Sequence, residues 1–179
     1  DYSDGRNAVS QTHVQGVGKL HLKRNNYSAP DAGGNYHKSL VDLYYIHDID
    51  RDWQLHFSMR GQYGWTPLDS SEQFYISGAD AVRAFVQGEA GGRSGMLGTL
   101  ELRRSLGRSG LTATAFVDAG RIMGDGTKNL AGAGVGLIYQ KSRDWYGKFD
   151  WATPLGCHYS ESLGKDIPST AWLRLVKQF

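Results

Sequence analysis

Apolar and polar side chains alternate with a period of two along most of this chain. The clearest case covers residues 53–63, where one face is apolar with Trp53 and Tyr63 at its ends, and the other face is wholly polar. A period of two predicts a β-strand rather than a helix. A tilted strand needs about 9–11 residues to cross a bilayer, and aromatic rings prefer the headgroup level at each end. The segment therefore predicts a membrane-spanning strand.

The same pattern predicts an all-β chain of about eight antiparallel strands. We place them at residues 14–23, 39–46, 53–63, 96–104, 110–120, 129–140, 144–153 and 171–179. The connections after the first, third, fifth and seventh strands are predicted to be longer than the others. Outer-membrane barrels sort their loops in this way, with short turns at one rim. We therefore predict one partial transmembrane β-barrel domain over residues 1–179, with a long inserted loop at about 64–95.

Composition leaves a soluble β-barrel or β-sandwich as the alternative. The chain has 179 residues, of which 24 are glycine and 12% are aromatic, and this suits many strands and tight turns. Its mean hydropathy of −0.47 does not decide the matter, because a membrane barrel is apolar only at every second position. A soluble barrel would show the same alternation with inside and outside exchanged. The aromatic strand ends and the sorted loops favour the membrane barrel.

The sequence offers little enzyme chemistry. It has no His-Glu-x-x-His motif, no phosphate-binding loop and one cysteine, Cys157, so an intrachain disulfide is excluded. Asp118 with Glu101 is a carboxylate pair that can be interpreted as one for glycoside hydrolysis, but the enzyme interpretation is disfavoured. We predict no enzyme, no catalytic residue, no metal and no cofactor. The net charge is +2 and no basic block is present, so no nucleic-acid partner is expected either. The first residues lack a secretion signal, so we expect a mature product or a fragment.

Two segments are unusual for a purely structural barrel. Residues 76–85 lie in the long connection but are too apolar for a solvated loop, so they must pack on something. Asp118 shares a strand face with Phe116 and Gly120, opposite the small apolar side chains that we expect to face lipid. A carboxylate inside a barrel is costly unless it is hydrated or paired, and Arg83 has the planar donors for a bidentate pair. We favour an Arg83–Asp118 pair over two separately hydrated groups.

These two segments resemble the signature motifs of the BamA-like outer-membrane barrels. The loop carries Val82-Arg83-Ala84-Phe85, and the strand carries Phe116-Val117-Asp118-Ala119-Gly120. Within that superfamily the chain is most similar to the two-partner secretion transporters, the haemolysin-activator type such as ShlB and FhaC. Further resemblance lies in Gly78-Ala79, Leu100-Glu101-Leu102-Arg103 and the final Phe179. The resemblance covers about residues 14–179.

The resemblance implies that this chain is the last half of a sixteen-stranded barrel in the bacterial outer membrane. It implies an ATP-independent conduit for a secreted haemolysin- or adhesin-like exoprotein, with POTRA domains upstream and the lipid bilayer as a further partner. A loop inserted in the lumen would be locked by Arg83 and Asp118. Side chains expected to support this loop-lock are Val82, Phe85, Phe116, Gly120, Glu101 and Arg103. The alternatives are a BamA-like assembly factor and a passive porin.

Two positions depart from the family pattern. Ala84 stands where the family motif has glycine, and if that glycine has a positive φ, alanine would cost on the order of 1 kcal/mol. Lys177 lies in the final strand where an apolar residue is expected. We therefore expect the loop tip to differ in shape from that of its relatives.

Overall fold

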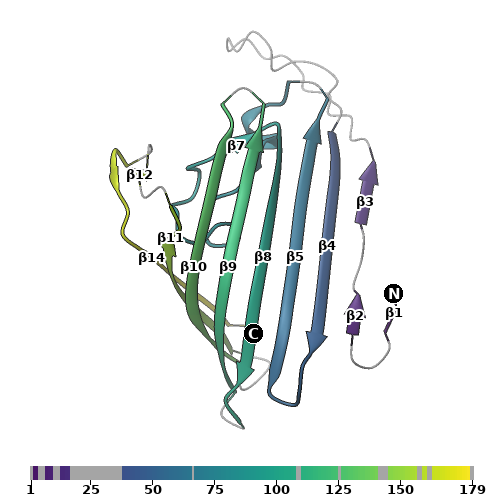
Figure 1. The fold of residues 1–179 in the computed structure, drawn as a ribbon, viewed down its shortest axis with the longest axis vertical. Helices are drawn as coiled ribbons and strands as arrows, with labels where there is room; N and C mark the ends of the chain where they lie inside the picture. Colours follow the sequence, from purple (N-terminus) through teal and green to yellow (C-terminus); the bar gives the residue numbers. More distant parts are fainter. Residues whose placement is uncertain are drawn as a thin grey trace.

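A computed structural model describes residues 2–3, 7–9, 13–16, 38–65, 67–107, 110–124, 126–140, 145–156, 159–160 and 163–177. Most of these residues form one antiparallel sheet, with the strand order β1-β2-β4-β5-β8-β9-β10-β11-β14, and β3 also pairs with β4 (Figure 1). The long strands are β4 (Lys38–Asp48), β5 (Trp53–Gly64), β8 (Ser94–Ser105), β9 (Leu111–Met123), β10 (Lys128–Tyr139), β11 (Trp145–Pro154) and β14 (Thr170–Lys177). The short ones are β1 (Tyr2–Ser3), β2 (Asn7–Val9) and β3 (His13–Gly16).

The strand predictions are confirmed within three residues for β4, β5 and β8 to β11, and β14 begins one residue early and is described to Lys177. The first predicted strand begins as β3, but residues 17–23 lie outside the described residues. The predicted long loop after the fifth strand is wrong. Strand β9 continues to Met123 and β10 begins at Lys128, so the connection is short, and Gly124 and Gly126 within it have φ values of 109° and 90°. Only a glycine reaches such angles without strain.

The two faces of the sheet have opposite chemistry to those of a soluble barrel. The buried face is polar and includes His56, Gln62, Glu101, Thr114, Asp118 and Asp150. The exposed face is apolar and includes Val117, Val135, Leu137, Phe149, Trp151, Leu173 and Leu175. Apolar side chains turned outward on successive strands fit hydrocarbon, whereas a soluble barrel would bury them. Among the described residues, no helix is long and apolar enough to cross a membrane.

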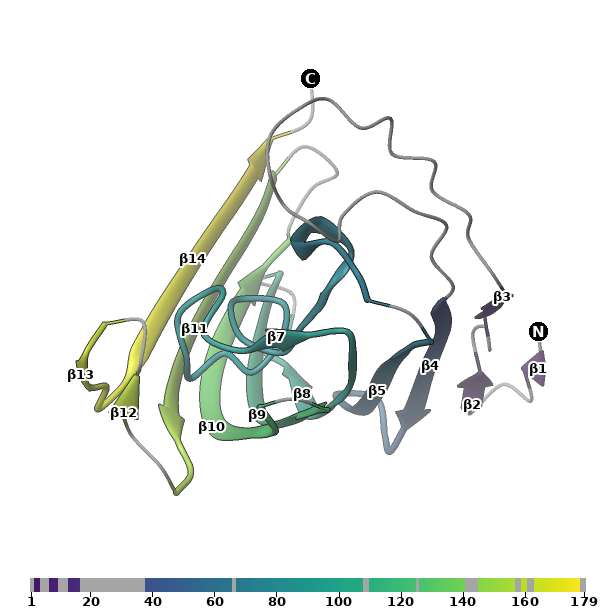
Figure 2. The ribbon, with the colours of Figure 1, turned by 90° about the horizontal axis from the view of Figure 1, so that it is seen from above.

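The connection between β5 and β8 folds back against the concave side of the sheet. It contains a short 3₁₀ helix, η1 (Ser70–Glu72), and a two-stranded hairpin of β6 (Phe74–Tyr75) and β7 (Gly91–Gly92). Viewed from above, the sheet curves around this inserted loop (Figure 2). Ile76, Val82 and Phe85 are at most 1% exposed, so the prediction that the apolar segment packs on something is confirmed. A second small sheet, formed by β12 (Tyr159–Ser160) and β13 (Lys165–Asp166), follows β11 and precedes β14 along the chain.

Glycines on β9 and β10 leave room on the inward face of the sheet, and the loop occupies part of it. Gly132, Gly134 and Gly136 lie opposite Asp118, Phe116 and Thr114 of β9, on the inward face. A Cβ atom at Gly132 would lie 2.5 Å from the Cβ of Ala84 in the loop, and one at Gly120 would lie 2.8 Å from the Cβ of Ile76. Both distances are shorter than atoms tolerate, so these positions admit the loop only as glycine.

Candidate functional site

The centre of the site is the ion pair between Arg83 of the inserted loop and Asp118 of β9. Arg83 is 4% exposed and Asp118 is fully buried. The guanidinium donates two hydrogen bonds to the carboxylate, from Nε and Nη2, each at 2.9 Å. The backbone N–H of Arg83 donates a third to the same carboxylate at 3.1 Å. This bidentate geometry holds both the side chain and the main chain of the loop against the sheet.

Two further carboxylates surround the same guanidinium. Glu101 of β8 accepts a hydrogen bond from Arg83 Nη1 at 2.8 Å, and Asp150 of β11 lies 3.6 Å from that atom. Each of these acids also has a cation of its own. Arg103 Nε lies 2.7 Å from Glu101, and Lys148 Nζ lies 3.1 Å from Asp150. Three cations and three carboxylates therefore form one ion cluster with no net charge, which suits a site shielded from water.

Burial and the neighbouring carboxylates shift the pKa of Arg83 in opposite directions. Burial by itself lowers the pKa of a guanidinium, because it disfavours the charged form. The hydrogen bonds and charge of Asp118, and then those of Glu101, outweigh burial and raise the pKa of Arg83 above its ordinary value. The side chain is thus a permanent cation, and the loop cannot be released by deprotonating it.

Aromatic and hydroxyl side chains complete the seat. The guanidinium carbon of Arg83 lies 3.2 Å from the ring centroid of Phe116, so the cation rests on the face of the ring. Thr99 of β8 lies opposite Asp118 and donates a hydrogen bond to its Oδ1 at 3.0 Å. Val82 and Phe85, on either side of the Arg83–Ala84 turn, are buried in the apolar core of the loop.

The structure brings the predicted loop-lock and supporting residues together around the inserted loop, and it adds several that sequence reasoning missed. Asp150 and Lys148 lie on the alternating polar face of β11 and belong to no motif. Thr99 carries no motif signal, although the register between β8 and β9 places it opposite Asp118. The contacts of the loop with β14 had no signal in the sequence, because they join residues more than 80 positions apart.

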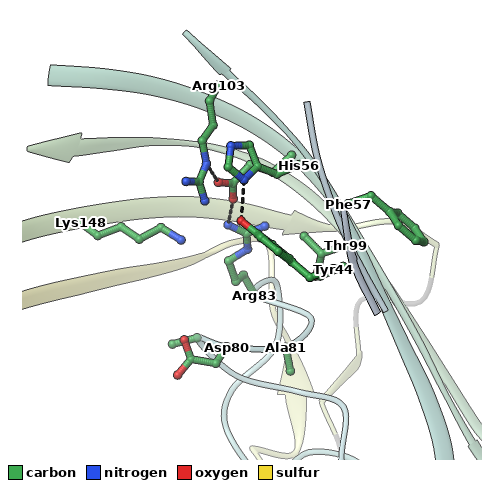
Figure 3. Close-up of a pocket in the computed structure, with 12 residues that line it drawn as sticks. Tyr44, His56, Phe57, Asp80, Ala81, Arg83, Thr99, Arg103 and Lys148 are labelled. Atoms are coloured by element: carbon green, nitrogen blue, oxygen red, sulfur yellow. Dashed lines mark hydrogen bonds and ion pairs between the residues drawn. The ribbon is translucent and has the colours of Figure 1, made fainter. Parts of the chain in front are cut away.

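A cavity of about 180 Å³ lies beside the ion cluster, between the loop and the wall of β4 and β5. Tyr44 and His56 line one side, with the tyrosine hydroxyl 2.7 Å from the histidine Nδ1, and Asp80 and Ala81 of the loop line another (Figure 3). Arg103 and Lys148 reach it from β8 and β11. In the part of the chain that the structure describes, no group of three His, Cys, Asp or Glu side chains is placed to hold a metal ion.

Removing the hydrogen bond from Thr99 to Asp118 tests how firmly the side chains around Arg83 hold the loop. In a Thr99→Val variant the shape is kept and the donor to Asp118 is lost, so we expect the loop to be held less firmly by about 1 kcal/mol. Hydrogen exchange of the loop amides should rise about fivefold, while exchange in β10 stays unchanged. Equal acceleration throughout the sheet would instead show that Thr99 stabilises the fold and not the seat.

The sequence profile of the haemolysin secretion/activation protein family ShlB/FhaC/HecB matches residues 4–139. The chain belongs to this family. The match confirms the resemblance indicated by the loop and strand motifs. Members of this family are outer-membrane β-barrel transporters of two-partner secretion, and the predicted outer-membrane location is thereby confirmed. The family is one of transporters rather than enzymes. Both Glu101 and Asp118 accept hydrogen bonds from Arg83.

A solved structure supports the fold. CdiB from Acinetobacter baumannii superposes with a TM-score of 0.65 at 22% sequence identity, over 81% of this chain. The chain spans 28% of the length of CdiB, so it corresponds to part of that barrel. No curated protein sequence matches the chain at a significant level.

Proposed function

We propose that this chain forms the last eight strands of a sixteen-stranded outer-membrane barrel that exports a secreted exoprotein in two-partner secretion. The observation that carries the proposal is the ion cluster that fastens the inserted loop to the inner face of the sheet through Arg83 and Asp118. Upstream POTRA domains would receive the client, a haemolysin- or adhesin-like exoprotein. The family membership of the chain supports both expectations.

The mechanism is passage rather than catalysis. The loop lies inside the curve of the sheet, where the exoprotein would have to pass (Figure 2). A neutral cluster of ion pairs is strong only while it is dry and fully paired, and water weakens it steeply. The lock therefore has two states. The loop is held while all partners are in place, and it is released as a unit when the polypeptide and its water enter the lumen.

A secretion assay tests the proposal. Cells producing the complete transporter with Arg83→Ala or Asp118→Ala should release at least tenfold less of the exoprotein that is encoded beside it into the medium, at equal amounts of transporter in the outer membrane. Arg121→Ala is the matched control, because Arg121 lies on β9 three residues beyond Asp118 but is exposed on the outer face. Normal secretion by both lock variants would contradict the lock.

The same assay separates the two alternatives. An assembly factor of the BamA type predicts that many outer-membrane proteins are depleted together, and not one exoprotein alone. A passive porin predicts ion conductance that does not depend on Arg83 and no client in the medium. The proposal predicts the loss of one exoprotein with the rest of the outer membrane unchanged.

A further inference from the structure

The inward face of β14 grips the loop at three successive inward positions. The hydroxyl of Thr170 donates a hydrogen bond to the carbonyl of Ala84 at 2.9 Å. The indole N–H of Trp172 donates to the carbonyl of Arg83 at 2.7 Å. Arg174 Nη2 lies 2.6 and 2.7 Å from the two carboxylate oxygens of Asp80. Positions two apart on a strand share a face, so this set forms a ladder along the loop.

The ladder differs in kind from the ion cluster. Thr170 and Trp172 bind carbonyl oxygens of the main chain, so they hold the path of the loop rather than a side chain. These two carbonyls belong to the turn that presents Arg83, and a buried carbonyl left without a donor is costly. Neither residue contacts Asp118, Glu101 or Asp150 by any hydrogen bond among the described residues.

The loop also connects strands that are far apart in the sheet. Arg60 of β5 donates a hydrogen bond to the carbonyl of Asp80, whose carboxylate is bound by Arg174 of β14. Four strands, β8 to β11, separate β5 from β14 in the sheet. Within the described residues β14 pairs with β11 alone, so its other edge has no strand partner there. The loop is thus the second element that restrains the last strand.

We propose that Thr170, Trp172 and Arg174 are positioning residues that form a second hold on the inserted loop, in addition to the Arg83–Asp118 lock. The importance of this second hold for export rests on the proposed function. The hold itself does not, and a direct measurement of loop exposure tests it without any client.

Cysteine labelling in the complete transporter measures that exposure. Ala81, which is 7% exposed, is replaced by cysteine in a protein in which Cys157 is serine. The rate of reaction with a charged maleimide then reports how often the loop leaves its seat. Thr170→Val and Trp172→Phe each remove one hydrogen bond with little change of shape. We expect the rate to rise about fivefold for each and roughly twentyfold or more for both.

Matched variants separate positioning from general stability. Thr170→Ser keeps the hydroxyl and should restore the original labelling rate. Trp151→Phe removes an exposed indole on the outer face of β11 and should leave the rate unchanged. Unchanged labelling in the Thr170→Val, Trp172→Phe double variant would overturn the proposal. So would equal acceleration by Trp151→Phe, because it would mark a general loosening of the sheet.

A charge reversal tests the outer rung of the ladder separately. Asp80→Arg alone places two arginines together and should raise the labelling rate, whereas Asp80→Arg combined with Arg174→Asp should bring it back towards the original value. Both side chains are largely exposed, so the effect should be two- to threefold at low salt and smaller at high salt. Absence of rescue would remove Arg174 from the second hold.

If secretion fails only with Arg83→Ala while labelling follows the ladder variants, the two holds are distinct. If the ladder variants label normally while Arg83→Ala blocks secretion, the ladder is wrong and the lock stands.

Discussion

Arg83→Met is expected to undock the inserted loop, because it should lower the free energy of loop docking by about 3–5 kcal/mol. The substitution keeps a long apolar stem but leaves Asp118, Glu101 and Asp150 without the cation that they share. Asp118 is destabilised most. Among the described residues its ion-pair partner is the Arg83 side chain, and its carboxylate is fully buried. The other two acids retain Arg103 and Lys148. The loop should leave its seat so that water can reach Asp118.

Hydrogen–deuterium exchange measures the undocking. The amides of Ile76, Ala81, Val82 and Phe85 are hydrogen-bonded within the loop in the docked structure. In Arg83→Met their exchange should rise roughly a hundredfold or more, with little change in β8 to β10. Slow exchange of these amides in the variant would show that apolar packing alone holds the loop.

The double variant Arg83→Met with Asp118→Asn provides the control. One cation and one carboxylate leave together, so the cluster keeps two of each, already paired as Glu101–Arg103 and Asp150–Lys148. The loss should be clearly smaller than the sum of the two single losses. A simple sum would mean that the two side chains do not act as a pair.

Gly132→Ala is expected to displace the loop by steric collision and to lower the free energy of unfolding by about 1–3 kcal/mol. The new methyl carbon would lie 2.5 Å from the Cβ of Ala84 and 3.3 Å from the carbonyl oxygen of Thr153. Neither the turn nor β11 can move far, because Arg83 is held by the ion cluster and Thr153 belongs to the sheet. The free energy of unfolding measured in urea should fall by this amount, and hydrogen exchange of the loop amides should become faster.

The partner substitution Ala84→Gly should restore stability in Gly132→Ala. The two methyl groups compete for one space, so removing either one relieves the collision. Alone, Ala84→Gly should cost little beyond a small cavity. If the double variant is no better than Gly132→Ala, then the collision with Thr153 decides the effect. In this protein Ala84, at the position of the family glycine, is thus accommodated by a glycine on the facing strand.

Motif and pattern carried much of the prediction because they depend on short stretches of chain. Alternation around Trp53 and Phe57 is a property of successive residues, so strand limits and faces followed from it. The predicted long loop after the fifth strand was wrong for the same reason. Pairing with β8 and β10, which no short stretch of chain encodes, extends β9 to Met123.

The sequence by itself determined that the chain is an alternating antiparallel sheet with an apolar loop, and its motifs named Arg83 and Asp118. Only the tertiary structure decided the full set of partners around them. Asp150 reaches Arg83 because β9, β10 and β11 are in register, with glycines between them. Thr170 and Trp172 reach the loop because it folds back across the sheet to the last strand. Such contacts join residues distant in the chain, and no local pattern encodes them.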